Sequence, residues 1–139
     1  MNPREVAERL LDGISRERWS DLPDLYAEDA VVEQPFSPVP VTLTGRTAIG
    51  EHFAAAAGLP LRVTAGNVVL HETADAEVVV VVEYDYLAEN TTTGHTRTVH
   101  NIQVLRVRAG RIVASRDYHD HAALTATASQ SLDSSTSGR

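Results

Sequence analysis

The second half of the chain is dominated by segments rich in β-branched residues. Four such segments span residues 61–72, 76–89, 95–108 and 111–120. Short stretches that contain Thr, Asp, Asn or Gly separate them, which predicts consecutive strands joined by tight turns. The run of five valines at 78–82 predicts a strand that is covered on both faces.

The first half of the chain contains apolar residues at helical spacing. Helices are predicted at residues 3–14, 20–29 and 47–58, where Pro can occupy a first turn or Ser, Asp or Thr can cap the helix. Residues 30–36 predict a short strand that a proline ends, and residues 37–45 predict a proline-rich loop. Two or three helices followed by a strongly twisted antiparallel sheet predict an α+β fold. We expect a cavity between the curved sheet and the helices packed on it.

The length and composition of the chain narrow its class. At 139 residues the chain fits one domain, which we expect at residues 1–122, followed by a flexible Ser/Thr-rich tail at 123–139. The net charge of −7 and the scattered Arg residues argue against nucleic acids and anionic membranes as partners. No segment reaches the roughly 18 consecutive apolar residues of a membrane span or has the pattern of a signal peptide. We therefore expect a cytoplasmic protein. The sequence has no Cys, which excludes disulfides and thiolate metal sites.

The segment GRIVASRDYHDH at 110–121 has the highest density of chemically reactive side chains. Strand alternation places Asp117 and His119 on one face of the strand. The opposite face is predicted to carry the alternate side chains, which are Ile112, Ala114, Arg116, Tyr118 and Asp120. In the neighbouring strand, Asn101 and Gln103 are predicted to lie on the same inner face as Asp117. These polar side chains, facing an otherwise apolar interior, form the candidate site.

Three segments of the chain resemble the nuclear-transport-factor-two-like superfamily. They are WSDLPDLYAEDAVVEQP at 19–35, LTGRTAIGEHFAA at 43–55 and VLRVRAGRIVASRDYHD at 104–120. Within that superfamily the chain is most similar to the SnoaL-like polyketide cyclases, and the resemblance covers residues 5–121. It implies a cone-shaped α+β fold around an apolar cavity and a homodimer that pairs through the outer face of the sheet. The fold alone does not determine the activity, because its members include enzymes, binding proteins and assembly modules.

The resemblance implies a role for Asp117 and excludes one related mechanism. The SnoaL-like cyclases place their acid/base carboxylate at the first Asp of a last-strand motif, which is Asp117 in SRDYHD. Ketosteroid isomerase has its general base where this chain has Gln34. Its two oxyanion donors correspond to Leu10 and Gln103. The amide of Gln34 cannot take a proton from carbon, and Leu10 cannot donate a hydrogen bond to an enolate, so that mechanism is excluded.

These residues predict a cofactor-free acid/base enzyme, a cyclase or isomerase that acts on an apolar, polyketide-type carbonyl compound of secondary metabolism. Asp117 is the expected acid/base. Asn101 and Gln103 are expected to orient the substrate carbonyl, with His119 as an auxiliary proton relay. A non-catalytic module of the same fold, which binds a small ligand or mediates dimerisation, is the alternative.

Epoxide hydrolysis and a metal site are two further hypotheses that the residues fit poorly. Limonene epoxide hydrolase needs an Arg two positions before an Asp, whereas the equivalent VEYDY has Asp85 but carries Glu83 in place of the Arg. His119 and His121 could bind a metal together with Asp117. A catalytic zinc site needs three well-supported protein ligands with an open position, so no metal or other cofactor is expected.

Other side chains are expected to line the cavity or to support the fold. The expected substrate-binding residues are Gln34, Asp85, Tyr84 and Trp19. Which of Tyr84 and Tyr86 faces the cavity is left open. Trp19 and Tyr26 also fit the core between helices and sheet, and Arg46 is expected to be structural. The remaining histidines are expected on the surface or in packing positions, and they are His52, His71, His95 and His100.

Overall fold

The computed structural model describes residues 1–74 and 79–129, and in that part of the chain four helical elements pack with six strands. The helical elements are α1 (Pro3–Ser15), the 3₁₀ helix η1 (Trp19–Leu25), α2 (Arg46–Ala57) and α3 (His121–Ala128). The strands are β1 (Tyr26–Gln34), β2 (Val41–Thr44), β3 (Leu61–Glu72), β4 (Val79–Asn90), β5 (Thr96–Arg108) and β6 (Arg111–His119). No helix among these residues is long and apolar enough to cross a membrane.

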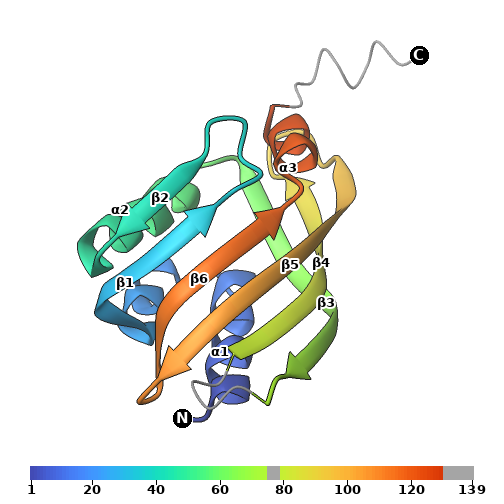
Figure 1. Cartoon of the computed structure of the whole chain (residues 1–139). Helices are drawn as coiled ribbons and strands as arrows, with labels where there is room; N and C mark the ends of the chain where they lie inside the picture. Colours follow the sequence, from blue (N-terminus) through green and yellow to red (C-terminus); the bar gives the residue numbers. More distant parts are fainter. Residues whose placement is uncertain (75–78, 130–139) are drawn as a thin grey trace.

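The six strands form one sheet in the order β2-β1-β6-β5-β4-β3. From β3 to β6, each strand pairs antiparallel with the next one in the chain, as the turn residues between them predict. Strand β6 also pairs in parallel with β1 on its other side, so it lies in the middle of the sheet. The sheet curls around α1 and α2, which lie behind it in the view of Figure 1. This arrangement confirms the predicted α+β fold with a curved, mostly antiparallel sheet.

Two local predictions for the first half of the chain differ from the structure. The segment at 20–29 forms the short helix η1 and enters β1 already at Tyr26. Pairing of Tyr26 with Ile112 of β6 overrides the helical spacing of this segment. The predicted loop at 37–45 contains β2, which pairs antiparallel with β1 at the edge of the sheet.

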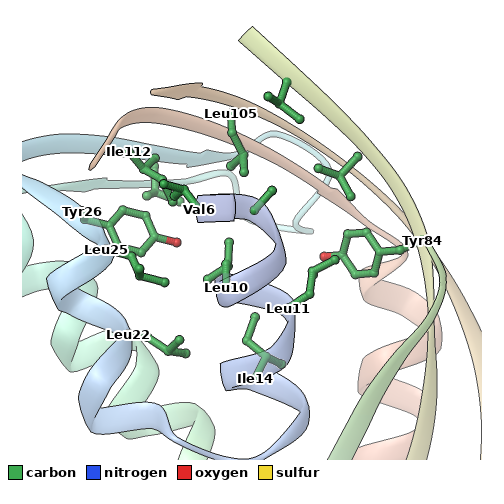
Figure 2. Packing of buried hydrophobic residues seen from close by; sticks show 14 of the residues in the cluster. Val6, Leu10, Leu11, Ile14, Leu22, Leu25, Tyr26, Tyr84, Leu105 and Ile112 are labelled. Atoms are coloured by element: carbon green, nitrogen blue, oxygen red, sulfur yellow. The ribbon is translucent and has the colours of Figure 1, made fainter. Parts of the chain in front are cut away.

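Helix α1 provides the centre of the core. The side chains of Asn2 and Glu5 each accept a hydrogen bond from the other residue's backbone N–H, which forms a capping box at its N-terminus. Val6, Leu10 and Ile14 then face the sheet at helical spacing, as predicted, and all three are buried. Figure 2 shows this stripe surrounded by apolar side chains of the sheet and of η1.

A bulge in β6 changes which side chains face the core. The pairing register of β5 and β6 shifts at Val113, which is left over between Ile112 and Ala114. Ile112 is consequently fully buried, whereas strict alternation placed it on the outer face. Beyond the bulge the alternation holds, with Ser115 and Asp117 buried. The bulge therefore lets one strand direct both Ile112 and Asp117 inward, which a regular strand of this sequence cannot do.

The valine run is not covered on both faces in the single chain. Val80 and Val82 are buried on the inner face of β4, while Val79 and Val81 on the opposite face are only partly buried. Residue 78 lies outside the described residues. The expectation of full coverage does not hold because α1 and α2 pack on the inner face of the sheet.

A helix occupies the start of the predicted tail. The sequence predicted a flexible segment at 123–139, but α3 continues to Ala128 and buries Ala123 and Thr127. The Ser/Thr-rich composition of residues 123–139 as a whole hides this helix, although its own residues include several Ala and Leu124, which packs against the core. The rest of the predicted tail, residues 130–139, lies outside the described residues.

Asn90 anchors α3 to the end of β4. Its Nδ2 donates to the Thr127 carbonyl at 3.0 Å. Its Oδ1 accepts from the backbone N–H groups of Thr92 and Thr93 at 2.8 and 3.1 Å. Because Asn90 is only 1% exposed, water cannot easily replace these bonds when the side chain is removed.

We predict that Asn90→Ala destabilises the protein by about 1–3 kcal/mol and releases α3 from the sheet, because buried partners lose their hydrogen bonds. Chemical denaturation measures the loss of stability, and hydrogen exchange of residues 121–128 measures the release. Thr98→Ala, an exposed substitution on β5, is the control and should change neither quantity. Unchanged exchange of α3 in Asn90→Ala would contradict the anchoring role.

Candidate active site

A cavity of about 530 Å³ lies between the curved sheet and the helices. Its apolar wall includes Leu10, Ile14, Trp19, Phe53, Leu61 and Val63. Its titratable and amide side chains are Tyr26, Gln34, His52, Tyr86, Gln103, Asp117, His119 and His121. Among the described residues that line the cavity, Asp117 is the only carboxylate and no side chain is an Arg. The cavity is thus largely apolar, as predicted, with one concentration of polar groups.

Asp117 is held in a fixed orientation at the inner face of β6. It is 6% exposed and lines the cavity. Its Oδ1 accepts a hydrogen bond from Gln103 Nε2 at 2.9 Å and a second one from the Ser115 hydroxyl. No described side chain donates to Oδ2. One carboxylate oxygen therefore positions the group, and the other remains for a bound molecule.

Gln103 connects Asp117 to a pair of buried tyrosines. Its Oε1 accepts from the Tyr84 hydroxyl at 2.9 Å, and the hydroxyl oxygens of Tyr84 and Tyr86 are 3.4 Å apart. Both tyrosines are buried on the inner face, because residues two apart on a strand share a face. Tyr86 lines the cavity, while Tyr84 lies behind it and supports Gln103. Gln103 therefore orients Asp117, rather than only the substrate carbonyl as predicted.

His119 is paired with Asn101 on the neighbouring strand. Its Nδ1 lies 2.9 Å from Asn101 Oδ1, and Asn101 Nδ2 donates to the Val99 carbonyl at 3.1 Å. Because Oδ1 can only accept, His119 Nδ1 carries the proton and Nε2 is an acceptor in the neutral ring. Burial lowers the pKa of His119, although the Asp117 carboxylate opposes this effect. Asn101 thus orients His119, and its amide is not the free donor to a substrate that the sequence predicted.

His52 and Gln34 form a second polar pair in the cavity. Gln34 Nε2 lies 3.3 Å from His52 Nε2, and since the amide nitrogen donates, the imidazole accepts. Burial lowers the pKa of His52, which favours this neutral ring. The prediction that His52 is a surface or packing residue is therefore incomplete. Its position three residues after Ile49 on α2 could have indicated that it faces inward.

Tyr26 and Trp19 also border the cavity. The Tyr26 hydroxyl has no hydrogen-bond partner among the described residues, and burial raises its pKa well above the ordinary value. It therefore stays protonated and can donate to a bound molecule. Trp19, predicted to bind substrate, lines the cavity and stacks on Phe53 with ring centroids 6.2 Å apart.

Asp85 does not belong to this site, contrary to prediction. It lies on the outer face of β4, where it accepts from Asn67 Nδ2 at 2.9 Å and contacts His100 Nδ1 at 2.6 Å. These two hydrogen bonds lower its pKa. Because Tyr84 and Tyr86 occupy the inner face, the residue between them must point outward. Asp85 therefore cannot act in the cavity as the carboxylate of an epoxide-hydrolase site.

Two other predicted placements agree with the structure. His71 is exposed on β3 and lies 2.6 Å from Glu83 Oε2. Arg46 donates twice to the Tyr26 carbonyl, from Nε at 3.0 Å and from Nη2 at 2.7 Å, which confirms its structural role. It fixes the start of α2 to the start of β1.

The two histidines of the HDH motif are neighbours but do not form a metal site with their surroundings. The ring centroids of His119 and His121 are 5.7 Å apart and the rings are nearly perpendicular. Within residues 1–74 and 79–129, no three His, Cys, Asp or Glu side chains are grouped so that they could hold a metal ion.

Comparison with known proteins identifies the family. The model of the family described as SnoaL-like domain matches residues 7–115, which is most of the chain. The chain belongs to the SnoaL-like domain family. The match ends before Asp117, His119 and α3, so the last part of the site lies beyond it. A search among curated proteins finds no match.

Solved structures show the same fold at low sequence identity. A candidate isomerase from Bacillus subtilis has a TM-score of 0.82 and 22% identity, with 91% of this chain and 95% of that chain covered. A candidate polyketide cyclase from Xanthomonas campestris pv. campestris has a TM-score of 0.75 and 18% identity, with 91% and 96% covered. A phenazine biosynthesis-related protein from Pseudomonas aeruginosa has a TM-score of 0.73 and 17% identity, with 93% and 86% covered.

We predict that acidification destabilises the protein through the buried histidines. The neutral His119 stabilises the fold fully above about pH 6.5, and this contribution is lost as the pH falls through its lower folded-state pKa. Chemical denaturation between about pH 7 and about pH 5 should therefore give a falling free energy of unfolding. His119→Asn should reduce this dependence without abolishing it, because burial also lowers the pKa of His52 and of His121.

The exposed His95 provides the matched control, since His95→Asn should leave the pH dependence unchanged. An equal slope in the wild-type protein and in His119→Asn would show that His119 does not resist protonation in the fold.

Proposed function

We propose that this protein is a cofactor-free acid/base enzyme, a cyclase or isomerase that acts on a neutral, largely apolar carbonyl compound. The observation that carries this proposal is the Asp117 carboxylate, which is held through Oδ1 and leaves Oδ2 free in an apolar cavity. Such a group suits the removal of a weakly acidic C–H proton, because it is fixed in place and poorly solvated. The family match and the similar structures named as isomerase, polyketide cyclase and phenazine biosynthesis-related protein support this class and a role in secondary metabolism.

The charges around the cavity limit the substrate. A ligand with its own carboxylate or phosphate would find no Arg among the described lining residues and would be repelled by Asp117. Burial lowers the pKa of His52, His119 and His121, so none of these rings supplies a positive charge at neutral pH. These features favour an uncharged substrate.

The proposed reaction begins with one proton transfer. Asp117 Oδ2 takes a proton from the carbon next to a substrate carbonyl, and the electron pair of the broken C–H bond moves into the carbonyl group to form an enolate. The Tyr26 hydroxyl donates to the enolate oxygen, since its proton is retained and has no other partner among the described residues. A donor aimed at the developing negative charge stabilises the transition state more than the ground state.

Return of the proton completes either reaction. In an isomerisation, Asp117 delivers the proton to a different carbon of the enolate. In a cyclisation, the enolate carbon forms a bond to a second carbonyl carbon of the same molecule, and the new alkoxide takes the proton. His119 is the next inward side chain on β6, and its Nε2 can accept and pass on this proton.

5-Nitrobenzisoxazole provides a direct test of the base. Removal of its C3 proton breaks the ring N–O bond and gives a coloured cyanophenolate, so the assay reports one proton transfer. We predict that the protein accelerates this reaction and that Asp117→Asn lowers the rate by about 10²–10⁴-fold, because the amide cannot accept the proton. Asp85→Asn removes a carboxylate from the outer face and should leave the rate unchanged.

Two outcomes would contradict the assignment. A protein without activity on this probe or on carbonyl compounds, which still binds apolar ligands equally in the wild-type and Asp117→Asn forms, would be a non-catalytic binding module. Activity that disappears on prolonged chelation and returns with zinc would make His119 and His121 metal ligands. We expect the activity to survive chelation.

We also propose a homodimer that buries the outer face of the sheet. A hollow on this face is lined in part by Phe36, Val69, Ile102 and Tyr118. Phe36, Val69 and Ile102 are 68%, 49% and 42% exposed, and the Phe36 ring contacts Tyr118 edge-on. An apolar area of this kind is unusual on a monomer, and a second copy of the same face would cover it.

We predict that light scattering at micromolar concentration gives twice the 15.1 kDa mass of the chain. Ile102→Asp should shift the protein toward the monomer, because it introduces a charge that the dimer would bury. Ala54→Asp on the exposed side of α2 is the control and should keep the dimer. A wild-type mass near that of one chain would exclude the proposed assembly.

A further inference from the structure

The side chain of Gln103 is held by hydrogen bonds at both ends of its amide group. Its Nε2 donates to Asp117 Oδ1 at 2.9 Å, and its Oε1 accepts from the Tyr84 hydroxyl at 2.9 Å. Both residues are buried, and Tyr84 points inward from β4 (Figure 2). A half turn of the amide would exchange its donor and its acceptor. The partners at the two ends therefore decide which atom of the amide faces Asp117.

The Tyr84 hydroxyl favours one of these two orientations. Burial raises the pKa of Tyr84 well above its ordinary value, so the hydroxyl keeps its proton. The described residues offer this proton two acceptors, Gln103 Oε1 at 2.9 Å and the Tyr86 hydroxyl oxygen at 3.4 Å. The shorter distance makes Gln103 the stronger partner. A turned amide would present its NH₂ group to Tyr84 and leave the proton only the longer contact, so Tyr84 disfavours it.

The orientation of the amide determines which oxygen of Asp117 can carry a proton. An amide NH₂ group donates and does not accept, so a proton on Oδ1 would face another donor. The Ser115 hydroxyl, which also contacts Oδ1, can donate or accept and therefore does not discriminate. A proton that Asp117 takes from a bound molecule consequently stays on Oδ2, from which it can be returned.

We propose that Tyr84 is a positioning residue that locks the Gln103 amide, so that Asp117 carries the transferred proton on Oδ2 alone. The proton of the substrate C–H bond binds a lone pair of Oδ2, and the electron pair of that bond stays with the substrate. Without the lock, the protonated carboxyl can turn and donate its O–H to a turned Gln103 amide, which directs the proton away from the substrate. The inference rests on the proposed function in taking Asp117 as the base.

Other titratable side chains face Asp117 across the cavity, and burial keeps each of them neutral at neutral pH. It raises the pKa of the tyrosines and lowers the pKa of the histidines. These side chains come from β1, α2, β4, β6 and α3, and they are Tyr26, His52, Tyr86, His119 and His121. All of them are retained when Tyr84 is replaced. A difference between the wild-type protein and a Tyr84 variant therefore reports the lost hydroxyl.

The pH dependence of the 5-nitrobenzisoxazole reaction tests the lock in Tyr84→Phe. A phenyl ring favours neither orientation of the amide, so a turned Gln103 can accept from the protonated carboxyl and stabilise the acid form of Asp117. We expect the midpoint of the rise in rate with pH to move upward by about 0.5–1 pH unit, which corresponds to one net hydrogen bond. Tyr118→Phe removes a hydroxyl from the outer face of β6 and should leave the midpoint unchanged.

A double-mutant cycle separates the lock from a general effect on packing. In a Gln103→Leu background there is no amide to turn, so adding Tyr84→Phe should give no further shift of the midpoint. A lower rate in Tyr84→Phe with an unmoved midpoint would show a packing role and overturn the proposal, as would an equal shift in both backgrounds. A rate that survives Asp117→Asn would instead contradict the proposed base, and it is observed with Tyr84 in place.

If Tyr84→Phe does not fold, nuclear magnetic resonance of the wild-type protein provides the test without turnover. The ¹³Cγ resonance of Asp117 reports its protonation, and the side-chain N–H protons of Gln103 report their hydrogen bond. We expect the hydrogen-bonded N–H signal of Gln103 to persist when Asp117 is protonated. Loss of this signal in step with the protonation of Asp117 would show that the amide turns, and would overturn the proposal.

Discussion

The register between β5 and β6 determines the chemistry of the cavity. It places Gln103 directly opposite Asp117 and Asn101 directly opposite His119. Each amide side chain then meets its titratable partner across the two strands, at 2.9 Å in both pairs. A slip of β6 by one residue would move Asp117 and His119 to the other face of the sheet, away from Gln103 and Asn101. The backbone ladder that stabilises the fold is therefore the same one that assembles the site.

The two amides orient the reactive groups without adding charge. Gln103 has a definite orientation because Tyr84 needs an acceptor at one end and Asp117 needs a donor at the other. Asn101 is fixed in the same way between the Val99 carbonyl and His119. A buried network in which every member is paired is rigid. It keeps Asp117 and His119 in place and adds no positive charge to the cavity. A cationic partner would instead make the carboxylate a weaker base.

Alternation predicted the inward positions of Asp117 and its partners, because the strands are regular around them. It failed at Ile112, since the bulge before Ala114 depends on pairing with β5 that no local pattern reveals. Asp85 was placed in the cavity through a loose resemblance, although it alternates with two buried tyrosines. His52 lies three residues after Ile49 on α2, but its polar ring does not fit the apolar pattern that predicts the inner face of a helix. The position of His121 depends on how α3 docks, and the Ser/Thr-rich residues that follow this Ala-rich segment hid the helix.

Strand β6 is the last strand among the described residues, yet it lies in the middle of the sheet between β1 and β5 (Figure 1). Its partner β1 is separated from it by most of the sequence, and such long-range pairing makes folding slow because chain entropy is lost before the contacts form. During synthesis the β1-β2 pair and strands β3 to β5 emerge first, and their open edges stay unpaired until β6 inserts between them. The strand that carries Asp117 and His119 is thus the one that joins the two parts of the sheet, so the protein gains its reactive groups in the same step that closes its exposed edges.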